Sequence, residues 1–306
     1  MGASALRGTA VAILSLGLVA VSFTQAQAAP ELATVSHASA PNSGVRGDWS
    51  GDGTVDLIGT RSNGTLWMYA GTSTGEVRSG VQIGSGWTDF DWQGSPGDVN
   101  GDGHTDMLAR RTNGTLWLYP GRGHGALGSG IQVGTGWSTM TAIATPGDFD
   151  LDGRPDLLAR RSDGTLHLYH ILATGGVRYV RLVGVGWNSM SSIIGMGDLN
   201  GDKRGDVVAV RQSDIPINMP NELWLDGTLF SFFSNGTRLL SARKVGGGWN
   251  VMTLLTSPGD MNKDGRGDLL ARRADGTLWF YAGRTGGGVL PGRQVGSGWN
   301  GMLRVL

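Results

Sequence analysis

Five loops in this sequence carry aspartates at fixed, alternating positions. Each has the form D-x-[DNS]-x-D-x-x-x-D, with an oxygen-bearing side chain at positions one, three, five and nine. Alternating oxygen ligands let a short loop curl around one hard cation, a glycine at position six permits the sharp bend, and the carbonyl at position seven adds a ligand. The pattern therefore predicts five cation sites.

The predicted ligands are the four side chains of each loop and the main-chain carbonyl of its seventh residue. In chain order they are Asp48, Ser50, Asp52, Thr54 and Asp56; Asp98, Asn100, Asp102, His104 and Asp106; Asp148, Asp150, Asp152, Arg154 and Asp156; Asp198, Asn200, Asp202, Arg204 and Asp206; and Asp260, Asn262, Asp264, Arg266 and Asp268. An EF-hand would place Glu at position twelve, where these loops have Gly or Ala. The ninth aspartate therefore has to close each site.

Calcium suits these loops best, because it accepts six to eight flexibly arranged oxygen ligands. We expect up to five structural Ca²⁺ ions. Sixteen of the 25 acidic residues lie in the five loops, and such clusters repel one another unless a cation neutralises them. The alternative is that these are solvated turns in which Asp is favoured by turn chemistry. That alternative explains one such loop more easily than five with the same spacing. The fourth loop fits least well, because Lys203 replaces its glycine.

The loops recur because the chain is built from repeats. Gly-Asp pairs start at residues 47, 97, 147, 197 and 259, with spacings of 50, 50, 50 and 62 residues. Each repeat holds four short apolar runs, two of them joined by an Asn-Gly or Asp-Gly turn typical of a hairpin. Long helices are excluded, since 54 of the 306 residues are glycine. Four strands in about 50 residues are typical of a propeller blade.

Residues 47–306 are therefore predicted to form an all-β, five-bladed β-propeller of four-stranded blades. The last repeat ends with an extra apolar run, residues 302–306, and the first repeat has no such run before it. We expect this C-terminal strand to complete the N-terminal blade as its innermost strand, which leaves no open edge. A solenoid is the competing array, and it would need atypical capping repeats.

The first 46 residues differ in composition from the repeats. Residues 1–28 have an early arginine, an apolar run over 10–23 and an Ala-Gln-Ala ending, which predict a cleaved signal peptide and a secreted, extracellular protein. The apolar run is shorter than the about 20 residues that a membrane span needs, so we expect no span in the mature chain. Residues 29–46, rich in Ala, Ser and Pro, are predicted to be a flexible leader.

Composition excludes several function classes. The chain has no cysteine, which rules out thiolate metal sites, disulfides and a cysteine nucleophile. Its 25 basic and 25 acidic residues balance without any basic block, so no nucleic-acid partner is expected.

Two known families share the repeated motifs. The loop over residues 97–106, GDVNGDGHTD, resembles the FG-GAP or VCBS repeats of integrin-type propellers. Residues 275–281, DGTLWFY, and 296–300, GSGWN, resemble the five-bladed lectin tachylectin. Together the resemblances cover residues 47–306. They imply a propeller with calcium in its loops and sugar-binding sites between adjacent blades.

Recurring tryptophans at the predicted blade junctions are candidate sugar-binding residues. The set comprises Trp87, Trp137, Trp187, Asn188, Trp249, Asn250, Trp299 and Asn300. A flat apolar ring beside hydrogen-bond donors is what a pyranose requires. Equally open is a purely structural role, in which the rings wedge between blades as core. Trp67, Trp117 and Trp279, and the arginine pairs that end the second strands, are assigned to packing, bridging or plain surface.

No catalytic residue is predicted. Residues 71–75 match G-x-S-x-G, but they lie in a connector rather than in the strand-to-helix turn of a nucleophile elbow. We expect a binding protein, in the first place a multivalent lectin for glycans or cell-surface glycoconjugates. The alternative is an adaptor that binds another secreted or cell-surface protein through an apolar insert in the fourth repeat, residues 212–226. A glycan-processing enzyme is the third option.

Overall fold

The computed structural model describes residues 45–212 and 227–306. The predicted signal peptide, residues 29–44 of the predicted leader, and residues 213–226 of the fourth-repeat insert lie outside the described residues. Across the described part, no helix has the length and apolar character to cross a bilayer.

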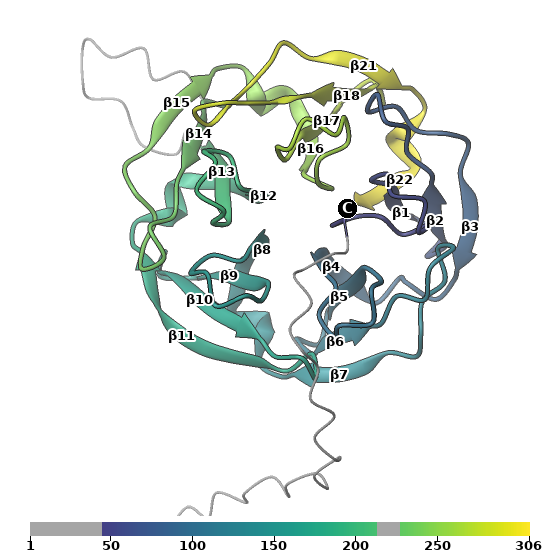
Figure 1. Ribbon diagram of the computed structural model, residues 1–306, viewed down its shortest axis with the longest axis horizontal. Coiled ribbons are helices and arrows are strands. Elements are labelled where there is room, and N and C mark those ends of the chain that lie inside the picture. The colour runs from purple at the N-terminus through teal and green to yellow at the C-terminus, as the bar shows by residue number, and fades with distance from the viewer. Residues whose placement is uncertain (1–44, 213–226) are drawn as a thin grey trace, which may run out of the picture. The chain divides into compact units, whose positions relative to one another are not determined.

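Five four-stranded antiparallel sheets surround a central axis (Figure 1). From the inside outwards, the first is β22 (Met302–Val305), β1 (Leu57–Arg61), β2 (Leu66–Tyr69) and β3 (Val81–Gly84), and the second is β4 (Phe90–Gly97), β5 (Asp106–Arg111), β6 (Leu116–Tyr119) and β7 (Ile131–Gly134). The third is β8 (Met140–Gly147), β9 (Asp156–Arg161), β10 (Leu166–Ile171) and β11 (Val177–Gly184). The fourth is β12 (Met190–Gly197), β13 (Asp206–Arg211), β14 (Leu229–Phe232) and β15 (Arg243–Gly246), and the fifth is β16 (Met252–Thr256), β17 (Leu269–Arg273), β18 (Leu278–Tyr281) and β21 (Arg293–Gly296).

Short elements complete the described chain. A small hairpin, β19 (Gly283–Arg284) with β20 (Gly288–Val289), follows the third strand of the last blade. Single 3-10 turns precede the innermost strands of four blades: η1 (Trp137–Thr139), η2 (Trp187–Ser189), η3 (Trp249–Val251) and η4 (Trp299–Gly301).

The ring is closed by its two ends, as the sequence predicts. Strand β22 pairs antiparallel with β1, with Gly59 opposite Val305. Beyond the strand, Ile58 and Leu306 exchange backbone hydrogen bonds of 2.9 and 3.0 Å. The first blade is therefore built from residues about 240 positions apart, and neither its inner strand nor the last repeat is left without a partner.

Tryptophans fill the space between blades. The tryptophan that ends each Gly-x-Gly-Trp segment is only 5–7% exposed; the five are Trp87, Trp137, Trp187, Trp249 and Trp299. Each ring packs on an aromatic ring of the following blade, with centroid distances of 4.6 to 5.1 Å to Tyr119, Tyr169, Phe232, Tyr281 and Tyr69 respectively. The structural role that the sequence left open is thus the one observed, since these faces are covered.

Arginines from the second strands join neighbouring blades across the same junctions. Arg110 donates through Nη1 to the carbonyls of Trp137 (3.0 Å) and Met140 (2.6 Å), where the next blade begins. Arg160 and Arg272 repeat this contact one and three blades further on. A charged donor that satisfies two buried carbonyls fixes the angle between two sheets.

The junction packing predicts a large loss of stability when one wedge is removed. Trp137→Ala should lower the free energy of unfolding by about 3–5 kcal/mol, because it leaves a cavity between two blades. Chemical denaturation at constant calcium measures the loss. The half-buried Trp117, on the third strand of the second blade, is the matched control, and Trp117→Ala should cost clearly less. Equal losses in the two variants would contradict the wedge role.

Candidate functional site

The five aspartate loops occupy equivalent places in the five blades. Each runs into the second strand of its blade, and the ninth aspartate stands at or next to the first residue of that strand, as Asp106 does in β5. Because all blades have the same strand order, the loops lie on one face of the ring. Their local chemistry is therefore repeated five times.

The first aspartate of each loop holds the curl through backbone N–H groups. In the second loop, Asp98 Oδ1 accepts from Gly101 N (2.7 Å), and its Oδ2 accepts from Gly103 N (2.8 Å). The corresponding bonds of Asp48, Asp148 and Asp198 recur at 2.6 to 2.9 Å, and Asp260 Oδ2 accepts from Gly265 N (2.7 Å). The loops therefore have the tight bend that the sequence predicts.

The ninth aspartate is the buried anchor of the loop. Asp106 is 0% exposed. Its Oδ2 accepts from Val99 N (2.9 Å) in the loop, and its Oδ1 accepts from Gly121 N (2.8 Å) after the third strand. Asp56, Asp206 and Asp268 are buried and bonded in the same way. These carboxylates tie the loop to the outer half of the blade.

Burial makes the negative charge of these carboxyls costly. Desolvation first, and the neighbouring carboxylates second, raise the pKa of Asp106 to about 6, of Asp206 and Asp268 to about 7, and of Asp156 to about 8. A divalent cation in the loop would offset that cost. The donor set, carboxylates and amide oxygens around a tight bend, fits such an ion. In the third loop, carboxylate oxygens of Asp148, Asp150 and Asp152 lie within 4.8 Å of one another.

The remaining predicted ligands lie on the rim of the loops. The N–H of the seventh residue donates to the fifth aspartate, as His104 N does to Asp102 Oδ1 (2.9 Å). Thr54, Arg154, Arg204 and Arg266 make the same bond at 2.8 to 3.1 Å. That their carbonyls bind an ion stays a prediction.

The predicted sugar residues separate into two groups. Stacking of a sugar on the five junction tryptophans is ruled out in this conformation, since each ring is buried against the next blade. Asn188, Asn250 and Asn300, by contrast, are exposed beside them. Asn188 Nδ2 donates to Ser162 O (3.0 Å), which holds that amide at the junction.

Two equivalent grooves lie over these junctions. The groove between the fifth and first blades has a volume of about 580 Å³ and is lined by Arg61, Asn63, Tyr69, Arg78 and the segment 295–299. The groove between the third and fourth blades has a volume of about 420 Å³, with the segment 183–187, Phe232 and residues 238–242 as its walls. Sequence reasoning assigned no role to Arg61 or Arg78.

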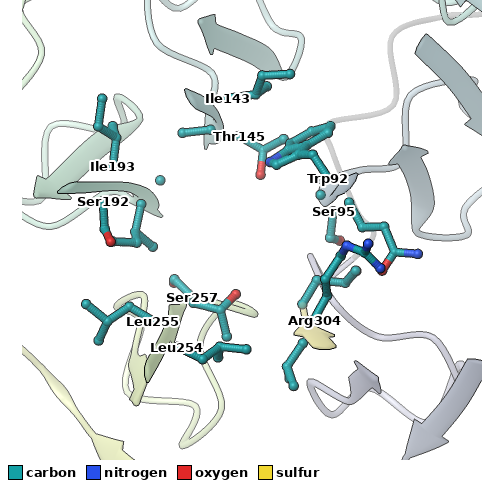
Figure 2. A pocket seen from close by; sticks show the side chains of 18 of the residues that line it. Trp92, Ser95, Ile143, Thr145, Ser192, Ile193, Leu254, Leu255, Ser257 and Arg304 are labelled. Carbon is teal, nitrogen blue, oxygen red and sulfur yellow. The ribbon is translucent and has the colours of Figure 1, made fainter. Parts of the chain in front are cut away.

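A third cavity, of about 360 Å³, lies on the central axis (Figure 2). The innermost strands of all five blades line it. An equivalent position on each of these strands lines the cavity and differs in every blade: Trp92, Ala142, Ser192, Leu254 and Arg304. Sequence reasoning missed this site, although variation at one position of an otherwise regular repeat was a signal for it.

Arg46 closes one part of this central cavity. Its Nε donates to Ser95 O (3.1 Å), and its Nη2 donates to Thr145 Oγ1 (3.3 Å), Gly195 O (3.3 Å) and Ser257 O (3.2 Å). It thus contacts four blades at once. Burial lowers its pKa to about 10, which leaves it charged at neutral pH. The sequence assigned this residue to the leader; in the structure it belongs to the propeller.

Ser73 and His170 also bear on possible chemistry, and one is exposed in a turn while the other lies against an aspartate loop. Ser73, in the G-x-S-x-G segment, is exposed in a turn between β2 and β3, where Thr72 N donates to Glu76 O (2.9 Å). His170, to which sequence reasoning gave no role, lies against the third loop, with Nε2 3.1 Å from Asp150 Oδ2.

Comparison with known proteins identifies the repeats. A family model described as the FG-GAP-like repeat matches residues 48–109, 98–159 and 148–209, which together cover more than half of the chain. A search of curated proteins gives no match. Two solved structures resemble the fold: BP39L lectin from Burkholderia pseudomallei (12% identity, 80% of this chain and 70% of that chain, TM-score 0.45) and AofleA from Arthrobotrys oligospora (13%, 83% and 72%, 0.44). At such identities the likeness concerns the fold alone.

The raised pKa values predict how the metal-free protein responds to pH. Between about pH 4 and 8 the folded state binds more protons than the unfolded chain, whose aspartates titrate near 3.9. Stability should therefore fall as pH rises, on the order of 1 kcal/mol per pH unit for each such carboxyl. Urea denaturation in chelator from pH 5 to 8 measures this slope, and Asp106→Asn should make it shallower. A stability that rises with pH in chelator would refute it.

Proposed function

This chain belongs to the FG-GAP-like repeat family, and from that premise we propose that it is a secreted, calcium-stabilised β-propeller that binds glycans and catalyses no reaction. Secretion rests on the sequence of residues 1–28 alone. The observation that carries the calcium role is the buried, hydrogen-bonded ninth aspartate surrounded by further carboxylates.

Calcium is the ion of choice because the ligands predicted within the loops are all oxygens. In the second loop the donors are Asp98, Asn100, Asp102 and Asp106, and the Asn100 amide is held by its Nδ2 donating to Asp102 Oδ2 (3.0 Å). Asn262 makes the same bond to Asp264 (3.0 Å) in the fifth loop. Such a donor set favours a hard cation of variable geometry. Because each loop joins two buried strands, ion binding adds directly to the stability of its blade.

Removal of calcium should therefore lower the melting temperature. At calcium concentrations about 100 times Kd, each occupied loop contributes roughly 2.7 kcal/mol, or about 5 °C in a domain of this size. Calorimetry with calcium, with chelator and with calcium restored measures the shift. Asp102→Ala should remove one ion by elemental analysis, and Thr88→Ala, at an exposed site away from the loops, should remove none. Unchanged melting in chelator would overturn the proposal.

The groove between the fifth and first blades supports glycan binding. Arg61, Asn63 and Arg78 place polar groups along it, opposite the backbone of residues 296–298. The Arg61 guanidinium lies 3.7 Å from the ring centroid of Trp67, which is half-buried, so a charged donor and an aromatic surface adjoin. Donors beside an apolar face are what a pyranose requires. With the equivalent groove two blades away, one chain presents two such sites, which favours multivalent binding.

A glycan array followed by titration calorimetry tests this groove. Arg78→Ala should weaken binding of any glycan that is captured by about tenfold, because it removes a charged hydrogen-bond donor, without changing the melting temperature. Arg122→Ala is the matched control, since Arg122 is also exposed but lies outside both grooves. The proposal fails when no glycan binds, or when the two variants lose affinity equally.

One observation favours protein binding as a second function. Val185 (71% exposed) and Leu240 (41%) line the groove between the third and fourth blades, and Tyr179 (51%) and Leu182 (46%) are exposed on the adjoining outer strand, β11. Exposed apolar side chains gathered at one place are typical of a protein-binding surface. The sequence suggests the insert at residues 212–226 for this role, and residues 213–226 of it lie outside the described residues.

A further inference from the structure

The third loop differs from the other four at its third position. Asp150 stands where the other loops have Ser50, Asn100, Asn200 and Asn262. The third loop thus has four carboxylates, from Asp148, Asp150, Asp152 and Asp156, within nine residues. Its electrostatic demand for a cation is the strongest of the five.

A second difference lies at the end of the third strand. In the first and second blades a glycine at this point donates its N–H to the ninth aspartate, as Gly121 N does to Asp106 Oδ1 (2.8 Å). A Cβ on Gly121 would lie 2.1 Å from Thr105 O, so the approach needs glycine. The third blade has Ile171 there. Its N–H donates instead to Pro155 O (3.4 Å), and β10 has six residues where β6 has four.

The isoleucine leaves the ninth aspartate of this loop without its second partner. Asp156 is 0% exposed, its Oδ2 accepts from Phe149 N (2.8 Å), and its Oδ1 has no hydrogen-bond partner. Asp150 Oδ1 is also buried without a partner. Buried carboxylate oxygens without a donor are costly, and a cation is the partner that such oxygens accept.

The lengthened strand also brings an imidazole to the loop. His170 replaces Ala70 and Pro120 of the first two blades. Its Nε2 lies 3.1 Å from Asp150 Oδ2 and its Nδ1 lies 3.2 Å from Asp152 Oδ2. A ring nitrogen of His170 and one carboxylate oxygen each of Asp150 and Asp156 lie within 4.8 Å of one another.

Two arginines of β11 approach the same cluster. Arg181 Nη2 lies 3.1 Å from Asp150 Oδ2, and Arg178 Nη2 lies 3.3 Å from His170 Nδ1. Arg181 orients one carboxylate, but four carboxylates around one such arginine still leave a net negative site. The remaining charge matches a divalent ion.

We propose that the third loop is a transition-metal site of the zinc class, with His170, Asp150 and Asp156 as ligands and the other loop carboxylates available to complete the shell. Imidazole nitrogen selects zinc-like ions over calcium, and carboxylates from the same loop supply tetrahedral partners. The predicted ligands of the other four loops are oxygens alone. The site therefore differs in metal preference from its neighbours in the ring.

The test uses the full chain, stripped by chelator and refilled with excess calcium. Zinc chloride titrated by calorimetry should bind with one equivalent per chain, and cobalt chloride should give visible absorption bands of a nitrogen-containing site. His170→Asn should lower zinc affinity at least about tenfold and reduce those bands, with the calcium content unchanged. His124→Asn is the matched control, since His124 is an exposed histidine outside the five loops, and it should leave zinc binding intact.

A second variant guards against misfolding of the first. Asp150→Asn gives the third loop the ligand pattern of the second and should weaken zinc binding without lowering the melting temperature in calcium. The proposal is overturned if zinc does not bind above calcium saturation, or if His170→Asn binds zinc as tightly as the parent. Elemental analysis also gives the number of calcium ions bound by the other four loops. A protein that binds no calcium there would contradict the proposed function, independently of whether the third loop binds zinc.

Discussion

The buried aspartate at the end of each loop is the interaction on which the blades depend. In four of the five blades its carboxylate accepts backbone N–H groups from two segments, the loop before the second strand and the connector after the third, as Asp106 does with Val99 and Gly121. One side chain therefore fixes where the hairpin begins relative to the innermost strand. An ionised group inside a sheet is tolerable only with such donors and with positive charge nearby. The same N–H donors and positive charge that stabilise this buried carboxylate therefore hold both the loop and the blade.

Between neighbouring blades, the fold depends on how side chains pack at the junction. A tryptophan and an arginine, such as Trp137 and Arg110, meet at the junction, where one fills the volume and the other satisfies the carbonyls of the next strand. The tryptophan recurs at all five junctions and the arginine contact at three of them, so specificity has to arise where the repeat is broken. Two such places among the described residues are the axial position that includes Trp92 and Arg304, and the third loop with His170.

Periodic features were predictable from the sequence, and features that depend on the environment of one side chain were not. Spacing and hairpin turns predicted the strands, their number and the pairing of residues 302–306 with the first blade. The burial of Trp137 could not be decided, because a ring at a blade junction has the same sequence signature whether it faces water or the next blade. Composition assigned Arg46 to the leader. Its four partners come from blades up to 211 residues away in the sequence, so no local pattern could indicate its contacts. His170 was overlooked because its role depends on Ile171, which alters the strand end by sterics alone.

Closing the ring with β22 also has a consequence for the order of folding. A nascent chain emerging from the ribosome can build the second, third and fourth blades as their strands appear, but β1 stays without its inner neighbour until Val305 has been made. Through most of synthesis, the edge at Leu57–Arg61 is thus open to pairing with a strand of another molecule. A chain without residues 302–305 would leave that edge permanently exposed, so β22 protects the first blade from aggregation.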